Sequence, residues 1–307
     1  MHLQYVVVDV FTTTRFLGNP LAIVRVPAAY GSQLSQEKKL QIAAEFNLSE
    51  TIFLHEPQNN SQEPFNSLSV DIFTPKCEIP FAGHPTIGAA AYILQHCTDL
   101  SSEAFQYLVT KAGPIPVAQE SPTGIVSARI PFDYHVHKAT VKSSVTITGV
   151  SPIVSIVSGL SFVLAELPDL KSLAGVSAGL RDDCFVPHDL DEGWDSGLTA
   201  TKYFVDLGED QKGQRQFRTR NFVSWEDPGT GSAASALGCY IALKEPKERG
   251  SGPFRYKFTQ GVEMGRQNDI FVSVKRSEDT TQVKEVFLRG STVLVSEGRM
   301  MIDDETA

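Results

Sequence analysis

The sequence predicts an α+β protein of two similar halves, each a curled, mostly antiparallel sheet around a central helix. The main observation is a pattern that occurs twice, in EIPFAGHPTIGAAAYIL (78–94) and EDPGTGSAASALGCYIAL (226–243). In both copies an acidic residue stands two places before a proline, a glycine follows the proline by three places, and a Tyr-Ile pair begins nine residues beyond that glycine. Each copy follows a strand-like run and continues into an Ala-rich segment typical of a buried helix.

The boundary between the halves is predicted from a polar join, AQESPTG (118–124), which lies between the two copies. A length of 307 residues suits two domains of about 150 residues. We therefore place the first half at 1–120 and the second at 121–307, and we allow the last strand to return to the first half. The strand-like runs are too short and too closely spaced for a Rossmann array.

In the first half, residues 3–11 predict a buried strand, and Gly18-Asn19-Pro20 marks a turn into a second strand at 21–26. Residues 35–46 carry apolar residues at helical spacing, with Ser35 as the expected N-cap and Asn47 as the stop. The runs that complete this half are expected to be strands, at 67–73 and within 101–117.

In the second half, one segment, 170–180, has helical spacing, and it precedes the second glycine turn. The other apolar runs predict short strands, at 125–132, 154–167, 203–207, 217–225, 254–259, 270–275, 283–289 and 291–296.

Composition narrows the class of function. With 41% apolar and 21% charged residues, the chain can bury a substantial core, and its net charge of −9 argues against nucleic-acid or membrane-surface partners. The four cysteines show no CxxC spacing, which favours reduced thiols over a disulfide framework or a zinc site: Cys77, Cys97, Cys184 and Cys239. Because no apolar run is long enough to span a bilayer, we expect a cytoplasmic protein that acts on a small molecule.

The two glycine turns are candidate ligand sites. Gly83 and Gly231 let the backbone approach a bound group, and the first N–H groups of the following helix have no intrahelical acceptor. Such helix ends attract carboxylate or phosphate groups. The next residue is polar in both copies, His84 in one and Ser232 in the other. The alternative is that the glycines serve close packing and that Ser232 is an ordinary N-cap.

A second candidate is Glu50, which begins the apolar run of NLSETIFL (47–54). Period-two alternation places Glu50 on the face of Ile52 and Leu54. A carboxyl group on an apolar face has a pKa raised by desolvation, which lets a Glu shuttle protons near neutral pH. The alternative is a solvated carboxylate at the end of a strand.

Other polar clusters give weaker signals. His135 and His137 can share one face of a strand as metal ligands, but no third ligand stands at a recognisable spacing, so we interpret them as ordinary histidines. Gly265-Arg266 is either part of an anion site or a strand-linking turn with a surface arginine. No Walker loop or GxGxxG occurs, and a nucleotide cofactor is not indicated.

A Ser/His/Asp hydrolase can be assembled on paper from Ser232, His84 and Asp227. However, Ser232 lies in TGSAA (230–234), which is not a nucleophile-elbow motif, so the sequence disfavours this class.

Together these segments resemble the PhzF family, which is named for the phenazine biosynthesis isomerase. The matching stretches lie in order across most of the chain: DVFTTTRFLGNPLAIV (9–24), NLSETIFL (47–54), IFTPKCEIPFAGHPTIGAAAYIL (72–94), EDPGTGSAA (226–234) and QGVEMGR (260–266). The resemblance implies the diaminopimelate-epimerase-like fold, an α/β roll of two pseudo-symmetric halves, often as a homodimer. Epimerases and racemases of that fold use two facing cysteines, which the turns PFAGHP and PGTGSA lack.

The resemblance also implies a mechanism and a set of site residues. In the PhzF isomerase one Glu of the NLSE segment takes a proton from one carbon of a cyclohexadiene amino acid and returns it to another, and Glu50 matches that residue. The other matches are substrate contacts: His84, Asp227 and Ser232 through their polar side chains, and Gly83 and Gly231 through backbone donors. No metal or organic cofactor is implied.

Two departures from the family concern the pocket rather than the proton-transfer group. The family often has Pro-Ser after the Gly-Arg, where this chain has Gln267-Asn268. Gly229 replaces a bulkier residue in the second turn. Both changes bear on the choice of substrate.

From the sequence we expect a cofactor-independent isomerase that moves a proton within a small carboxylate-bearing substrate, with Glu50 as general acid/base. The alternative is a non-catalytic small-molecule-binding or scaffold protein that keeps the fold without the chemistry.

Overall fold

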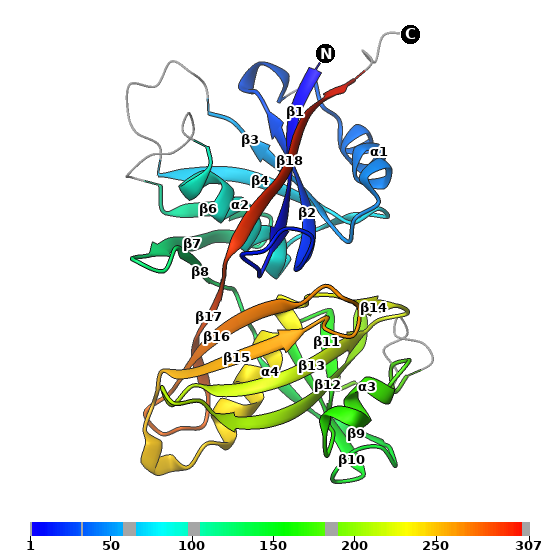
Figure 1. Ribbon diagram of the computed structural model, residues 1–307, viewed down its shortest axis with the longest axis vertical. Coiled ribbons are helices and arrows are strands. Elements are labelled where there is room, and N and C mark those ends of the chain that lie inside the picture. Colours follow the sequence, from blue (N-terminus) through cyan, green and yellow to red (C-terminus); the bar gives the residue numbers. More distant parts are fainter. Residues whose placement is uncertain (1, 32, 58–65, 98–104, 182–189, 303–307) are drawn as a thin grey trace. The chain divides into compact units, whose positions relative to one another are not determined.

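The computed structural model describes residues 2–31, 33–57, 66–97, 105–181 and 190–302; Cys184 and the start of the 101–117 segment lie outside these ranges. The chain forms two compact units (Figure 1), one of Met1–Arg129 with Gly290–Ala307 and one of Ile130–Arg289. The boundary thus lies after residue 129 rather than after 120, because β8 (Ile125–Arg129) pairs with β7 (Gly113–Glu120). The last strand, β18 (Thr292–Met301), pairs with β1 (His2–Val10) of the first unit.

In its described residues the first unit contains two α-helices, α1 (Gln36–Phe46) and α2 (Gly83–Gln95), and a short 3-10 helix, η1 (Ala28–Tyr30). Besides β1 and β18, its strands are β2 (Asn19–Val26), β3 (Thr51–His55), β4 (Ser67–Phe73), β5 (Glu78–Ile79), β6 (Tyr107–Thr110), β7 and β8.

The second unit contains α3 (Leu170–Gly175), α4 (Gly231–Lys244) and the 3-10 helix η2 (Lys247–Arg249). Its strands are β9 (His135–Lys142), β10 (Val150–Val157), β11 (Leu160–Glu166), β12 (Leu198–Glu209), β13 (Arg215–Phe222), β14 (Glu226–Asp227), β15 (Phe254–Gln260), β16 (Asn268–Arg276) and β17 (Val283–Gly290).

Strand pairing follows the same order and direction in both units. In the first, β1 and β2 are antiparallel, β2 and β3 parallel, β3 and β4 antiparallel, β4 and β6 parallel, and β6, β7 and β8 antiparallel. In the second, the series β10, β11, β12, β13, β15, β16 and β17 repeats those relations. The short strands β5 and β14 occupy matching places beside β4 and β13. The predicted α+β architecture of two similar halves is therefore present strand for strand.

Each unit buries one helix against its sheet, and small side chains make this possible. Residues 83–93 of α2 are all buried, as is most of α4. At Gly88 a Cβ atom would lie 2.5 Å from Leu21 Cδ2 and 2.8 Å from Val10 Cγ2, so the strands pack directly on the helix backbone. At Gly238 a Cβ would lie 3.0 Å from Val272 Cγ1. At these two glycine positions the sheet packs against the helix backbone, and a larger side chain would not fit without a shift of its neighbours.

Local signals set the helix that precedes Glu50. The Ser35 side chain accepts a hydrogen bond from the Lys38 N–H at the start of α1, as the N-cap prediction requires. Asn47 ends α1 in the left-handed conformation, with φ 49° and ψ 33°, and its N–H donates to Ala43 O. The chain therefore turns sharply at Asn47 and enters β3 only four residues later.

Several predicted bounds differ from the structure. The strand expected at 217–225 ends at Phe222, because Val223 N–H bonds to Trp225 O in a turn that leaves Trp225 53% exposed. The helix expected over 170–180 ends at Gly175, and Val176 is already extended. β12 begins five residues before the predicted start at Tyr203, so it includes Lys202.

The left-handed conformation of Asn47, at the turn that leads to Glu50, can be tested by substitution. Asn47→Ala is expected to lower the free energy of unfolding by about 1 kcal/mol, because an ordinary side chain strains this conformation. Asn47→Gly, which adopts it freely, should match or exceed the wild type. Denaturant unfolding of the three proteins measures the difference. Equal stability of the Ala and Gly variants would contradict this role for Asn47.

Candidate active site

The first predicted turn places Gly83 and His84 at the start of α2. Ala82 is the N-cap and provides no side-chain cap, and its carbonyl accepts from both the N–H and the hydroxyl of Thr86. The backbone N–H groups of Gly83 and His84 have no acceptor within the helix, because they belong to its first turn. His84 itself is buried, with 5% of its surface exposed.

Glu50 lies against this helix end. Its Oε2 is 3.4 Å from Nδ1 of His84, and its side chain is 19% exposed. Desolvation raises the pKa of Glu50 to about 7, and the Ser49 hydroxyl opposes this shift. At neutral pH the carboxyl group therefore exists in both protonation states, which is the condition for a group that accepts and returns a proton.

The predicted face of Glu50 agrees with the packing of β3. Phe53 belongs to the apolar cluster that includes Ile42 and Ala43 of α1, so odd-numbered positions face α1. Even-numbered positions, Glu50 among them, face the side of α2, where His84 lies. Both faces of β3 are buried, and burial therefore shows no alternation along the strand.

The second turn brings Asp227, Gly231 and Ser232 to the start of α4 in the other unit. The Thr230 hydroxyl donates to Asp227 Oδ2, and the Gly229 N–H lies 3.4 Å from Asp227 Oδ1. The Asp227 carboxylate thus stabilises the turn that precedes the helix by accepting hydrogen bonds from two of its residues. Ser232 is partly exposed at the second helical position, and Thr230, rather than Ser232, is the N-cap residue.

Gln260, at the end of β15, ties this turn to the sheet. Its Nε2 donates to Asp227 O at 2.7 Å and to Thr230 Oγ1 at 3.1 Å, while its Oε1 accepts from the Thr230 N–H at 3.3 Å. Gln260 Oε1 also accepts from the amino group of Lys202 on β12. Lys202 is not among the site residues predicted from the sequence; the available signal was a lysine inside the apolar run TATKYFV (199–205).

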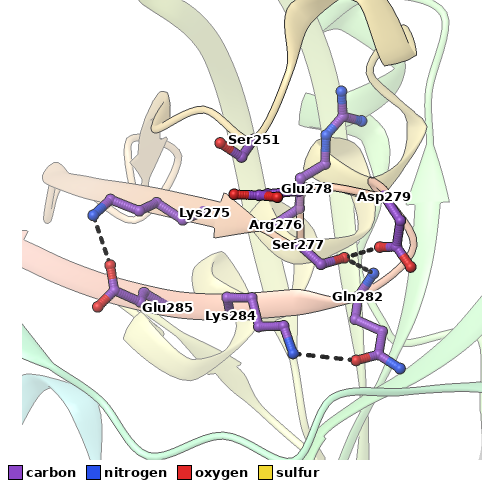
Figure 2. A pocket seen from close by; sticks show the side chains of 9 residues that line it. All are labelled: Ser251, Lys275, Arg276, Ser277, Glu278, Asp279, Gln282, Lys284 and Glu285. Carbon is purple, nitrogen blue, oxygen red and sulfur yellow. Dashed lines mark hydrogen bonds and ion pairs between the residues drawn. The ribbon is translucent and has the colours of Figure 1, made fainter.

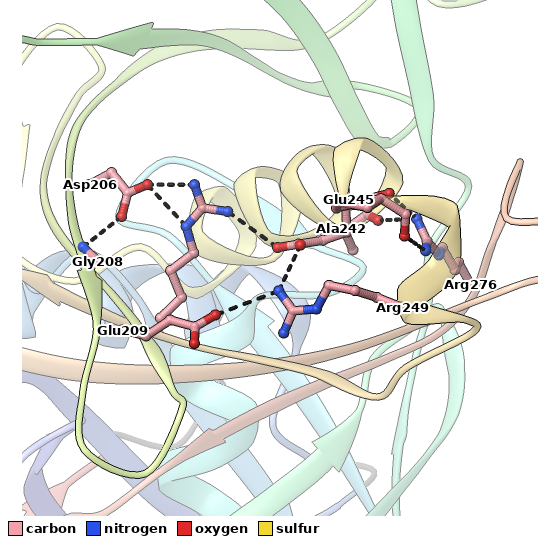
Figure 3. Close-up of polar contacts among 9 residues, drawn as sticks. Asp206, Gly208, Glu209, Ala242, Glu245, Arg249 and Arg276 are labelled. Carbon is pink, nitrogen blue, oxygen red and sulfur yellow. Dashed lines mark hydrogen bonds and ion pairs between the residues drawn. The ribbon is translucent and has the colours of Figure 1, made fainter.

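The opposite end of α4 is fixed by a cationic cap (Figure 3). Arg276 is 2% exposed and donates from Nη1 to Ala242 O at 3.1 Å and to Glu245 O at 2.7 Å. A cation at the helix C-terminus also complements the helix dipole. Arg249 and Arg215 pair with the Glu245 carboxylate beside it. The helix is held at its C-terminal end, which fixes the direction of its N-terminus.

Gly229 and Asn268, the two departures from the family pattern, depend on each other. Asn268 Nδ2 donates to Pro228 O at 2.6 Å and to Arg266 O at 2.7 Å. A Cβ at Gly229 would lie 2.3 Å from Asn268 Oδ1. The missing side chain at Gly229 is therefore the space that the larger Asn268 fills. Gly265-Arg266 forms a turn between β15 and β16 in which the Arg266 N–H donates to Gly261 O.

The histidine pair meets a third potential ligand, Asp191, and the ligand atoms of the three residues lie within 4.8 Å of one another. Both ring nitrogens of His137 are engaged, however: Nε2 lies 2.7 Å from Ser155 Oγ, and Nδ1 accepts from the Asp191 N–H. His135 bonds Asp191 Oδ2 at 2.9 Å and stacks on Trp194. These hydrogen bonds connect β9 to the segment around Asp191 and account for the grouping of the three side chains.

A surface recess of about 580 Å³ lies beside the β16–β17 hairpin (Figure 2). Lys275 pairs there with Glu285 at 2.8 Å, and the recess contains none of the predicted site residues. The three cysteines that the structure describes, Cys77, Cys97 and Cys239, are not in disulfide bonds. Within the described ranges, no helix is long and apolar enough to cross a membrane.

The pattern of the PhzC-PhzF family, described as phenazine biosynthesis-like protein, matches residues 8–298. The chain belongs to this family. It is 31% identical over 303 residues to "Uncharacterized isomerase PM1503" of Pasteurella multocida, with 97% of this chain and 94% of the relative covered. It is 29% identical over 310 residues to "Trans-2,3-dihydro-3-hydroxyanthranilate isomerase" of Pseudomonas aeruginosa, covering 97% of this chain and 99% of the relative.

The fold agrees with that of a solved PhzF family protein from Bacillus anthracis, with a TM-score of 0.73, 20% identity, and coverage of 98% of this chain and 100% of the other. The resemblance inferred from the sequence is thus confirmed. This PhzC-PhzF chain is an enzyme of the isomerase class, as its named relatives are.

Burial of Glu50 predicts a pH-dependent cost to stability. Between pH 4.5 and 7 the folded chain holds this proton and the unfolded chain loses it, so stability falls as pH rises through that window. Glu50→Gln removes the titration. Relative to the wild type, the free energy of unfolding of the variant is expected to rise by at most about 3 kcal/mol between pH 4.5 and pH 8. Urea unfolding across this range measures the gain, with Glu45→Gln, on the exposed face of α1, as the control. A constant difference at all pH values would contradict the desolvation of Glu50.

The Gly229–Asn268 pair gives a double-mutant prediction. Gly229→Ala alone should cost roughly 1–3 kcal/mol of stability, because the methyl group meets the Asn268 amide. Combined with Asn268→Ser, which removes that amide, most of this extra cost should disappear. Thermal unfolding of the two single variants and the double variant gives the coupling. Additive costs would show that the two positions are independent.

Proposed function

We propose that this chain is a cofactor-independent isomerase that moves a proton between two carbons of a small carboxylate-bearing substrate, with Glu50 as the general acid/base. The observation that carries the proposal is the carboxyl group of Glu50, whose pKa is about 7, beside His84 at the N-terminal end of α2. A carboxylate with this pKa is a stronger base than an ordinary Glu and still donates a proton at neutral pH.

The steps balance with one carboxyl group. The Glu50 carboxylate takes a proton from a C–H bond next to an unsaturated or carboxylate-bearing system, and the electron pair of that bond delocalises into the substrate. Glu50, now neutral, returns the proton to another carbon of the same system. The product is an isomer, and the enzyme ends in its starting protonation state.

The helix N-termini supply electrostatic stabilisation for such a reaction. The negative charge that develops on the substrate is favoured by backbone N–H groups that are already oriented, as those of Gly83 and His84 are. In the second unit, Gly231 and Ser232 offer the same kind of donors at the start of α4. We assign the His84 ring to orienting the Glu50 carboxylate, since its Nδ1 is 3.4 Å from Oε2.

The substrate class follows from the donors and from the relatives. Two helix ends favour a substrate that carries a carboxylate, and one relative is named for an isomerase of trans-2,3-dihydro-3-hydroxyanthranilate, an unsaturated cyclic amino acid. That compound is the first candidate to test. The coupled change at Gly229 and Asn268 alters the second turn, so related unsaturated and amino carboxylic acids should be tested together with that compound.

The test is deuterium uptake from heavy water, followed together with product isomers, for wild type and Glu50→Gln. We expect the variant to lose about 10²–10⁴-fold in rate while it still binds substrate, because the amide replaces the carboxyl without carrying its proton. The wild-type rate should fall below pH 7, where Glu50 is protonated and cannot act as base.

The matched control is Glu45→Gln, which should keep the wild-type rate. Full turnover by Glu50→Gln on a substrate of the wild type would refute the assignment. Binding of the carboxylates by wild type, without isomer formation or exchange across the panel, would favour a small-molecule-binding protein instead.

A further inference from the structure

One polar row crosses the sheet of the second unit beside the start of α4. In the strand registers Lys202 of β12 pairs with Asn221 of β13, and Asn221 pairs with Asp227 of β14. Residues that pair directly across strands project from the same face of a sheet. Three polar side chains therefore lie side by side, and the row ends at the carboxylate that closes the second turn.

The same row is apolar in the first unit. Its registers pair Ile52 of β3 with Ile72 of β4, and Ile72 with Ile79 of β5. The first unit thus builds its glycine turn with no polar group in this row. The polar row is a property of the second unit alone, and the fold does not require it.

Lys202 is the least expected member of the row. It is fully buried, with 0% of its surface exposed, and its amino group donates to Gln260 Oε1. Gln260 in turn bonds the backbone or side chain of Asp227 and Thr230. An amide has two possible orientations, and a donor at Oε1 selects the one that directs Nε2 to the Asp227 carbonyl. Lys202 therefore acts on the turn through Gln260.

Asn221, between Lys202 and Asp227, points independently to a bound polar group. It is fully buried, and neither its Oδ1 nor its Nδ2 has a hydrogen-bond partner among the residues that the structure describes. Buried amides in folded proteins are nearly always satisfied, by protein, water or ligand. Because Asn221 pairs in register with Asp227, which closes the turn before α4, we infer that a polar group bound at this turn is its partner.

We propose that Lys202 is a positioning residue of the second turn: it orients Gln260 and balances the charge of Asp227, so that the first N–H groups of α4 receive an anionic group of the ligand. The inference rests on the proposed function, in which this turn binds part of the substrate. Without the lysine, the Asp227 carboxylate would repel an anion at the same helix end.

The charge of Lys202 makes this binding pH-dependent. Burial lowers the pKa of Lys202 to about 7, and Asp227 opposes the shift. Asp227 is the charged group that acts on the amine, whereas Leu164, Asn221 and Gln260, its neighbours on β11, β13 and β15, are neutral. Below pH 7 the ammonium offsets the carboxylate; above pH 7 the offset is lost, and anion affinity falls.

The experiment is a sulfate titration of the full-length chain, followed by the backbone amide NMR signals at constant ionic strength. Sulfate keeps its charge between pH 6 and pH 8. In the wild type, saturable shifts are expected at Gly231 and Ser232, weaker at pH 8 than at pH 6. In Lys202→Met the dissociation constant at these amides should rise about tenfold at pH 6, as for the loss of one charged hydrogen-bonding group, and should no longer depend on pH. The amides of Gly83 and His84 report the other helix end and should respond as in the wild type.

Lys202→Gln separates the orientation of the Gln260 amide from the positive charge of Lys202. It also replaces the Met variant if that variant folds poorly. It keeps an N–H donor for Gln260 without the charge, so the amide positions without sulfate should stay near wild type while the pH dependence disappears. Unchanged sulfate constants at Gly231 in both variants, or no wild-type response at Gly231, would overturn the proposal. Turnover by Glu50→Gln tests the proposed function separately, because it does not involve the sulfate response of α4.

Discussion

Burial of α2 and α4 within their sheets is the constraint on which the rest of the structure depends. A helix enclosed on its sides offers polar backbone groups only at its ends, and in α4 the C-terminal end is already occupied by Arg276. The N–H groups of the first turn, which have no acceptor within the helix, then lie at the N-terminus, where each helix follows a glycine turn. Enclosure also requires small side chains, which is why Gly88 meets Leu21 and Val10 directly.

The two units use one plan of strands but different chemistry at the turns. Thr51 and Thr201 hold matching places, because they pair with Phe73 and Phe222 in equivalent registers. The residue before them is Glu50 in one unit and the buried Ala200 in the other. The repeat therefore carries one such carboxyl group rather than two, and this asymmetry supports a single group that both removes and returns a proton.

The sequence was sufficient for the parts of the fold that depend on local chemistry. Helix α1 begins after Ser35 and ends at Asn47, as predicted. Both ends are predictable because a single residue provides the N-cap and a single residue adopts the left-handed conformation. Strand ends were less predictable: Trp225 continues an apolar run, yet a turn at Val223 leaves it exposed. Lys202 was missed for a related reason. Its role depends on pairing with Asn221 and on contact with Gln260, 58 residues away in the chain.

The site shows the same division between local and long-range information. Motifs pointed to Glu50 and the two glycine turns as candidates, but the pKa of Glu50 depends on desolvation by the packing around it, which the strand pattern only suggests. Gly229 and Asn268 appeared as two separate departures from the family, and only the contact between them shows that they are one exchange of volume. Because Asn268 also donates to the Pro228 carbonyl, this exchange changes side-chain contacts of the second turn, and Glu50 is not among them. Glu50, the proposed proton-transfer group, belongs to the other unit, so the sequence of the second turn can change while the surroundings of Glu50 stay the same.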